Sequence, residues 1–246
     1  MRLALLSDLH ANLRALQACL ADARRRGASD HAFLGDLVGY GAEPAQVVDT
    51  VRAMAGDGAI VLRGNHDDLA VAGATGASSG EAGARWTHSQ LAPDQLDFLR
   101  NLPLDHRIGT ALLVHASADA PASWPYVDSA PRARQCLDAA DRPVVFCGHV
   151  HHQRLWYDGR RGDVMPFEPT TDAPVPLAPH RRWLATVGSV GQPRDGDTRA
   201  MYALWEPGPP ARLAFCRVPY AHLDAAAAVR RAGLPPEYAR RLEEGR

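Results

Sequence analysis

Two short segments of the sequence carry paired residues of the kinds that bind metal ions. They supply four candidate ligands, Asp8, His10, His149 and His151. In each segment the two polar residues are two positions apart, so in an extended chain both side chains point to the same side. Carboxylate oxygens and imidazole nitrogens are ligands for borderline divalent metals. The two segments therefore predict a metal site.

Four more candidate residues follow other predicted strands. They are Asp36 after 31–35, Asn65 and His66 after 59–63, and His115 at the end of a predicted hairpin. Ligands bind where the carboxyl ends of parallel strands gather at one edge of a sheet. A carboxylate such as Asp36 can bridge two ions, and a water shared by two cations about 3.5–4 Å apart loses a proton near neutral pH and attacks phosphorus in line. The candidate residues are thus of the kinds that two-metal chemistry of this sort uses.

The elements that must position these residues alternate between strand and helix in the N-terminal third. Strands are predicted at 2–7, 31–35 and 59–63, with helices at 11–26 and from Pro44 onward. Such an order implies parallel strands joined by right-handed crossovers. Further on, the patterns predict helical segments at 80–101, 131–140, 221–232 and 236–243, and strands at 104–108, 111–115, 143–147, 155–157, 182–187, 201–205 and 213–218. The proline-rich stretch 166–179 is predicted to be a loop or a sheet edge. We expect one domain over 1–246, with 221–246 as a helical tail.

Composition excludes several enzyme classes. All 27 basic residues are arginine, so the chain lacks the lysine of a P-loop, of a protein kinase or of a pyridoxal enzyme. The formal net charge of -1 argues against a long nucleic acid as partner, because phosphate contacts dominate that affinity. No apolar run is long enough to span a membrane. The four cysteines form no CxxC pair, which predicts reduced thiols in a cytoplasmic protein.

Five sequence blocks, in order and properly spaced, resemble the calcineurin-like metallophosphoesterase superfamily. They are Asp8-x-His10, Gly35-Asp36, Gly64-Asn65-His66-Asp67, Val114-His115 and Gly148-His149-x-His151. The segments 188–195 and 217–220 resemble those of the small single-domain phosphoesterases of bacteria and archaea, a phosphodiesterase-like branch. The resemblance implies a four-layer α/β/β/α sandwich of two mixed sheets, with the metals between the sheet edges.

The resemblance also implies roles for individual residues. Two divalent ions are expected, with manganese as first choice and iron, nickel or zinc as alternatives. The first ion would be held by Asp8, His10, Asp36 and His151, and the second by Asp36, Asn65, His115 and His149. His66 would protonate the leaving oxygen or donate to the phosphoryl group, and a hydroxide bridging the ions would attack phosphorus.

The second block departs from the protein-phosphatase pattern. Gly39 stands where that branch has an Asp that orients the acid histidine, and Tyr40 stands where it has an Arg that grips phosphate. We therefore favour phosphodiesters, with dinucleoside polyphosphates second and phosphoproteins third. A nuclease and a non-catalytic scaffold are rival hypotheses; the complete ligand set argues against the scaffold. A small phosphoester or nucleotide is the expected partner.

Three residues next to the blocks have open roles. Arg194 is a candidate for gripping substrate phosphate, because arginine binds phosphate through two hydrogen bonds; the alternative is an ion pair between loops. His152 directly follows the fifth block, where an alternating chain would turn it away from the metals, so its contact with substrate is a tentative prediction. Asp67 is expected to cap a helix.

Overall fold

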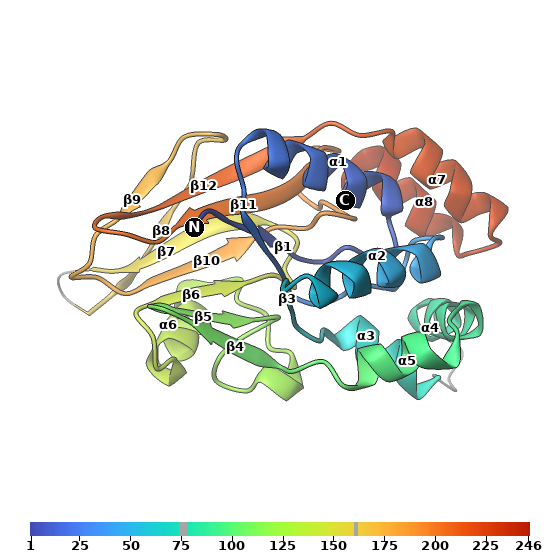
Figure 1. The fold of residues 1–246 in the computed structure, drawn as a ribbon, viewed down its shortest axis with the longest axis horizontal. Coiled ribbons are helices and arrows are strands. Elements are labelled where there is room, and N and C mark those ends of the chain that lie inside the picture. Colours follow the sequence, from blue (N-terminus) through green and yellow to red (C-terminus); the bar gives the residue numbers. More distant parts are fainter. Residues whose placement is uncertain (74–77, 160–161) are drawn as a thin grey trace.

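The computed structural model describes residues 1–73, 78–159 and 162–246. Two six-stranded sheets lie face to face with helices on their outer sides, which confirms the expected sandwich (Figure 1). The first sheet has the order β3-β2-β1-β11-β12-β9 and the second β4-β5-β6-β10-β7-β8. Each sheet mixes parallel and antiparallel neighbours.

The strands of the first sheet are β1 (Leu3–Leu6), β2 (Asp30–Phe33), β3 (Ile60–Val61), β9 (Val175–Leu177), β11 (Ala200–Glu206) and β12 (Ala211–Val218). Those of the second are β4 (Asp105–Ile108), β5 (Ala111–Val114), β6 (Val144–Cys147), β7 (Gln153–Asp158), β8 (Val164–Phe167) and β10 (Trp183–Val187). Of the prolines of 166–179, Pro166 lies within β8 and Pro176 within β9, which are outermost in their sheets, and the others lie outside the strands. This matches the predicted sheet edge, since proline cannot donate to a central ladder.

The helices are α1 (Leu13–Arg25), α2 (Pro44–Gly56), α3 (Asn65–Ala72), α4 (Ser79–Gln90), α5 (Pro93–Arg100), α6 (Ala130–Ala139), α7 (His222–Arg231) and α8 (Pro236–Glu244), with a short 3-10 turn, η1 (Pro121–Ser123). Among the described residues, no helix has the length and apolar character needed to cross a membrane.

The boundaries predicted for a single domain, residues 1–246, stay a prediction.

Three apolar clusters hold the four layers together. One lies between the first sheet and its helices, and includes Phe33 and Leu16. The second fills the space between the two sheets, where Phe146 and Trp205 pack with ring centroids 5.3 Å apart. The third joins the second sheet to α6 and includes Leu137. Burial of this apolar surface stabilises the two sheets in a fixed relation, so the loops at their carboxyl ends meet in a defined geometry.

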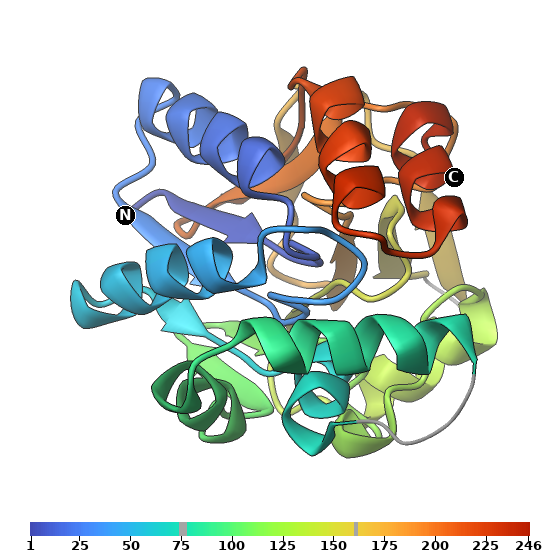
Figure 2. The ribbon, with the colours of Figure 1, turned by 90° about the vertical axis from the view of Figure 1, so that its right-hand side faces the viewer.

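The C-terminal helices α7 and α8 form a separate cluster at the end of the sandwich. Tyr238 and Leu242 are buried there, and Tyr40 from the loop between β2 and α2 packs against the same cluster. Figure 2 shows this loop directly beneath the two helices. The helical tail predicted from the sequence is therefore in contact with a loop that follows Asp36.

Candidate metal centre

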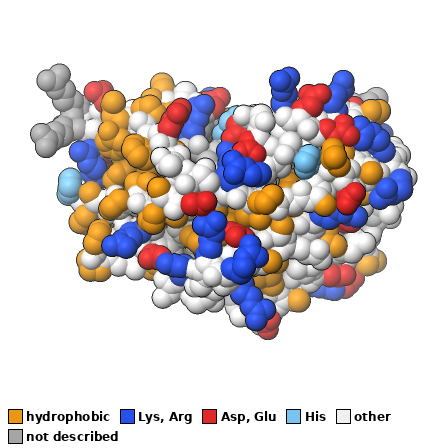
Figure 3. Space-filling view, turned by 90° about the horizontal axis from the view of Figure 1, so that it is seen from above, with side chains coloured by type: hydrophobic (Ala, Val, Ile, Leu, Met, Phe, Trp, Pro, Cys, Tyr) orange, Lys and Arg blue, Asp and Glu red, His pale blue; other side chains and the backbone are white. Residues whose placement is uncertain are grey.

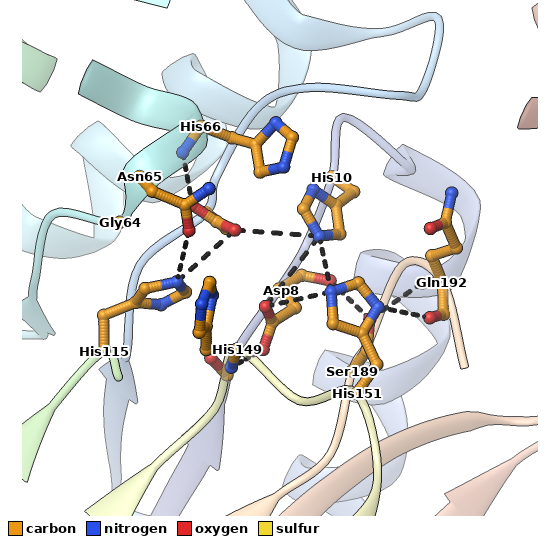
Figure 4. A network of polar contacts seen from close by, with 12 residues as sticks. Asp8, His10, Gly64, Asn65, His66, His115, His149, His151, Ser189 and Gln192 are labelled. Carbon is orange, nitrogen blue, oxygen red and sulfur yellow. Dashed lines mark hydrogen bonds and ion pairs between the residues drawn. The ribbon is translucent and has the colours of Figure 1, made fainter. Parts of the chain in front are cut away.

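The candidate ligands lie in loops at the carboxyl ends of five strands. Asp8 and His10 follow β1, Asp36 follows β2, Asn65 begins α3 after β3, His115 follows β5, and His149 and His151 follow β6. The side chains converge between the two sheets (Figure 4). Parallel strands of both sheets, β1, β2 and β3 in the first and β5 and β6 in the second, thus deliver ligands that are far apart in the sequence.

The backbone at these ligands differs from the extended chain assumed from the spacing. Positive φ angles occur at Asp8 (54°), His10 (47°), Asp36 (53°), His149 (66°) and His151 (59°). Residues other than glycine seldom adopt this left-handed region, and such strain tends to cluster at functional sites. The extended-chain explanation was therefore wrong: the paired side chains converge because the backbone turns sharply at each of them.

The donor atoms of the candidate ligands form two adjacent groups, which approach each other at Asp36. Donor atoms of Asp8, His10 and His151 lie within 4.8 Å of one another, and so do those of Asp36, His115 and His149. Oδ2 of Asp36 lies between the groups, 3.8 Å from Nε2 of His10 and 3.4 Å from Nε2 of His115. Oδ1 of Asn65 is 3.2 Å from Nε2 of His115. All seven predicted metal ligands are thus brought together.

Backbone carbonyls set the orientation of three of the histidines. Nδ1 of His10 donates to the carbonyl of Val38 at 3.2 Å, Nδ1 of His115 to that of Leu34 at 2.7 Å, and Nδ1 of His151 to that of Gln192 at 2.6 Å. Because a carbonyl oxygen only accepts, each Nδ1 carries hydrogen. In the neutral rings, each Nε2 then presents a lone pair to the cluster, as a metal-ligating histidine does.

Buried polar atoms without hydrogen-bond partners indicate that the site fits metal ions. Oδ1 of Asp8, Oδ2 of Asp36 and Nε2 of His149 are buried and lack such a partner among the described residues. Leaving a buried polar atom unpaired is costly, so buried groups of this kind are normally paired or bound to metal. The orphaned atoms belong to the two donor groups, and the mixture of oxygen and imidazole nitrogen suits a borderline divalent cation.

The electrostatics of the cluster favour ionised carboxylates. Burial would raise the pKa of Asp36, but the positive charges of His115 and His66 hold it well below its usual range. Burial would also raise the pKa of Asp8, but His151 outweighs this effect and lowers it. Burial lowers the pKa of His149 to about 4, with help from His115. The carboxylates are therefore charged and His149 is neutral at neutral pH, as metal ligation requires.

His66 lies beside the cluster, and donor atoms of Asp36 and His10 lie within 4.8 Å of a nitrogen of its ring. Its backbone N–H donates to Oδ1 of Asp36 at 2.8 Å, and its ring centroid is 5.0 Å from that of His10 and 4.5 Å from that of Tyr40. Burial lowers its pKa and the charge of Asp36 opposes this effect, but the charges of His151, His115 and Arg194 lower the pKa, so it stays below its usual value. Aromatic neighbours therefore hold the ring where the protein-phosphatase pattern has an aspartate.

Asp67 caps the helix that carries His66, as predicted. One carboxylate oxygen accepts from the backbone of Leu37 and Val38 at 2.9 and 3.2 Å, and the other accepts from Gly64 at 2.9 Å. Burial raises the pKa of Asp67 to about 7, with a further contribution from the nearby charge of Asp36. The residue joins the second and third sequence blocks, and this contact positions Asp36 against α3.

The two tentative substrate residues lie on different sides of the cluster. Arg194 donates from Nε and Nη2 to Oε1 of Gln192 at 3.2 and 2.8 Å, and its guanidinium carbon is 5.6 Å from the centroid of the Tyr40 ring. Nδ1 of His152 lies 2.9 Å from the carbonyl of Val150. His152 lines a groove of about 200 Å³ together with Tyr126 and Arg154.

Sequence reasoning missed two aromatic residues that cover the ligands. The Tyr126 ring stacks on His149, with centroids 4.1 Å apart and an interplanar angle of 22°. Trp124 contacts His115 edge-on at 5.7 Å. Both come from the segment between β5 and α6, which carries no motif. The only signal in the sequence is the presence of two aromatic residues in a proline-containing loop.

Comparison with known proteins agrees with this geometry. The model of the calcineurin-like phosphoesterase superfamily domain matches residues 1–207. A crystal structure of a metallophosphoesterase from Sphaerobacter thermophilus has a TM-score of 0.89 and 37% identity, and the match covers 100% of this chain and 99% of that one. A hypothetical protein from Pyrococcus horikoshii shares the fold with a TM-score of 0.78 at 17% identity, over 100% and 98% of the two chains.

Two curated relatives also match. An uncharacterized protein of Methanocaldococcus jannaschii is 30% identical over 215 residues, which are 83% of this chain and 82% of the relative. A symmetrical bis(5'-nucleosyl)-tetraphosphatase of Methylococcus capsulatus is 32% identical over 168 residues, but these are 60% of this chain and 57% of that enzyme. With its complete set of candidate ligands, the chain belongs to the calcineurin-like phosphoesterase superfamily, whose members are metal-dependent phosphoester hydrolases.

Proposed function

We propose that the protein hydrolyses phosphodiesters at a centre that binds two divalent metal ions. The observation that carries the proposal is the pair of donor groups on either side of Asp36, each with its atoms within 4.8 Å. Asp8, His10 and His151 hold one ion, Asn65, His115 and His149 hold the other, and Asp36 serves both. When bound, the ions supply positive charge to the phosphoryl oxygens and acidify a water for in-line attack.

The chain's own residues orient the phosphoryl group and supply a proton. Asn65 and His66, at the start of α3, point toward the cluster from one side. The low pKa of His66 in the free protein makes its ring neutral at neutral pH. An anionic substrate beside it favours the charged form, so His66 takes up a proton on substrate binding and donates it to the leaving oxygen.

Phosphodiesters are favoured because the protein-phosphatase arginine is replaced by Tyr40. The Tyr40 ring sits between the rings of His10 and His66 and offers no bidentate grip for a monoester dianion. Dinucleoside polyphosphates are the second candidate, since the tetraphosphatase of Methylococcus capsulatus is a relative. A serine/threonine protein phosphatase is the third.

The expected setting is a reducing cytoplasm, with a small phosphoester or nucleotide as substrate. All four cysteines are buried and free, which supports a compartment where thiols stay reduced. Manganese is our first choice for reconstitution, ahead of iron, nickel and zinc.

The decisive experiment compares bis(p-nitrophenyl) phosphate with p-nitrophenyl phosphate on chelator-treated protein, before and after manganese is added. We expect no turnover of either ester after chelation, and restored turnover that favours the diester. A preference for the monoester would reject the diester assignment. Absence of turnover with manganese, iron, nickel and zinc would reject the proposed activity.

A further inference from the structure

Two arginines beside the Tyr40 ring, Arg194 and Arg241, make no ion pair among the described residues, as several other arginines of the molecule also do not. Arg182 and Arg230, by contrast, have carboxylate oxygens 2.6 Å away, and Figure 3 shows arginine and acidic side chains interspersed over one face. Within the described residues, neither Arg194 nor Arg241 has a carboxylate oxygen within 4.0 Å. The residues that the structure does not describe, 74–77 and 160–161, contain no acidic side chain.

Both guanidinium groups face the same aromatic ring. The guanidinium carbon of Arg194 lies 5.6 Å from the centroid of Tyr40, and that of Arg241 lies 5.5 Å from it. The same ring is 4.5 Å from His66 and 4.7 Å from His10. Two unpaired cations therefore border the candidate metal centre on the side of the proposed proton donor.

Each arginine is held in place by the fold rather than by a carboxylate. Arg194 donates twice to Gln192, whose backbone carbonyl accepts from His151. Arg241 comes from α8, and this helix is anchored where Tyr238 meets Tyr40 edge-on at 4.9 Å. A cation that is already positioned over an aromatic ring loses less entropy when it binds an anion.

The positive charges of Arg194 and Arg241 make their placement at the Tyr40 ring unfavourable unless an anion binds between them. Both guanidinium groups carry a positive charge, and each lies within 5.6 Å of the centroid of the same ring. Positive charges gathered around one ring repel each other. A phosphate oxygen beside the two guanidiniums would relieve the repulsion and accept charge-assisted hydrogen bonds.

We propose that Arg194 and Arg241, placed over the ring of Tyr40, form a subsite for a second, non-scissile phosphate group of the substrate. The inference rests on the proposed function and, among its candidate substrates, selects nucleotides with an anhydride-linked phosphate chain, the class of the second candidate. In the reaction, water oxygen bonds to the phosphorus at the metal centre and the P–O bond to the next phosphate breaks. One proton of the water goes to the solvent, and His66 gives its proton to the leaving phosphate oxygen.

The test compares two ligands that differ by one phosphate. Manganese-loaded protein is titrated calorimetrically with AMP and with α,β-methylene-ADP, which cannot be hydrolysed at its diphosphate. We expect the diphosphate to bind wild type roughly tenfold tighter than AMP, as a hydrogen bond to a charged group implies. Arg241→Gln removes this preference, and Arg241→Lys keeps part of it by retaining the charge.

Arg240→Gln is the matched control. Arg240 is the preceding residue on α8 and is exposed, so its replacement leaves the preference intact. Equal binding of the two ligands by wild type would overturn the subsite. So would an Arg241→Gln variant that melts at a lower temperature yet keeps the preference, because Arg241 would then only hold α8 on Tyr40. Failure to hydrolyse bis(p-nitrophenyl) phosphate would reject the proposed function instead, since these titrations need no turnover.

Discussion

Nε2 of His10 lies 3.0 Å from Nε2 of His151, although 141 positions separate the two histidines. The Nδ1 atoms of both rings donate to backbone carbonyls, so in the neutral rings both Nε2 atoms are acceptors. Two facing acceptors repel each other unless a proton or a cation lies between them. Burial and the charge of His151 hold the pKa of His10 well below its usual range, which disfavours a proton there. A metal cation bound by both Nε2 atoms would satisfy the two acceptors at once.

Asp36 is the residue whose loss should affect both proposed metal sites. We expect Asp36→Asn to bind less metal than wild type, because its Oδ2 lies within 3.8 Å of Nε2 of both His10 and His115. The kcat/KM for bis(p-nitrophenyl) phosphate should fall by about a hundredfold or more, the upper end of what loss of supporting contacts around a metal costs. Metal content is measured by elemental analysis of dialysed protein.

Asp22→Asn serves as the control for this variant. Asp22 is also buried and accepts from Tyr202 at 2.6 Å and from Arg26 at 2.7 Å, but it lies outside the candidate centre. We expect it to lower the melting temperature while metal content stays at the wild-type level. Wild-type metal content and turnover in Asp36→Asn would contradict the shared-ligand role.

Metal binding should release a proton from His115. Burial alone would lower the pKa of this residue, but the charge of Asp36 raises it from 6.5 to about 9. In the metal-free protein this proton stabilises the fold below pH 6.5, and the contribution is lost as the pH rises toward 9. Metal ligation needs the unprotonated Nε2, so manganese affinity should increase about tenfold per pH unit in this window.

Calorimetry in two buffers of different ionisation enthalpy counts the released protons. We expect about one proton per chain at pH values between the two pKa values, and fewer above pH 9. A manganese affinity that does not change with pH in this window would show that His115 is neutral in the metal-free protein.

The resemblance of five sequence blocks to a known family was sufficient to predict the sandwich, and it named seven candidate metal ligands that the structure brings together. The strand ends carry residues of distinctive type, such as Asp36 after β2 and His115 after β5, and the topology of a parallel sheet fixes which ends meet. Asp67 was predictable for a similar reason, because a cap is a local feature of helix α3. For Asp36, His115 and Asp67, the sequence signal that identifies the residue lies within a few positions of it.

The residues around the ligands could not be predicted in this way. Arg241 meets Tyr40 across about two hundred positions of the chain, and a helical pattern shows which face of α8 is apolar but not which loop it covers. Tyr126 reaches His149 from a loop of irregular conformation. The left-handed backbone at His10 and His149 is held by partners distant in the sequence, since the N–H of His10 donates to the carbonyl of Asp36 and that of His149 to Oδ2 of Asp8. These features depend on tertiary packing.

His66 should matter most for substrates with poor leaving groups. If it donates the proton to the leaving oxygen, His66→Gln should reduce the hydrolysis of alkyl phosphodiesters by about 10²–10⁴-fold. Bis(p-nitrophenyl) phosphate should be affected far less, because nitrophenolate leaves without protonation. The measurement is kcat for both substrates in wild type and variant. An equal loss for both would mean that His66 binds the phosphoryl group and is not the acid.

Gly39 should be required at its position because of His66. Its φ is +91°, and a Cβ atom there would lie 2.7 Å from Nδ1 of His66. Gly39→Ala should therefore shift the imidazole and reduce turnover of poor leaving groups, in addition to losing about 1–2 kcal/mol of stability from the left-handed backbone. The Gly39→Asp variant, which restores the aspartate of the protein phosphatases, should also lose activity, since its Cβ occupies the same place.

Gly58→Ala separates the two effects. Gly58 has a similar φ of +98°, but a Cβ atom there would meet nothing within 4 Å. Both alanine variants should lose comparable free energy of unfolding in urea, because both strain the backbone in the same way. Only Gly39→Ala should lose turnover. Equal activity of the two variants would mean that catalysis tolerates a shift of the His66 imidazole. The tight packing of Gly39 against this ring would then have no part in proton donation.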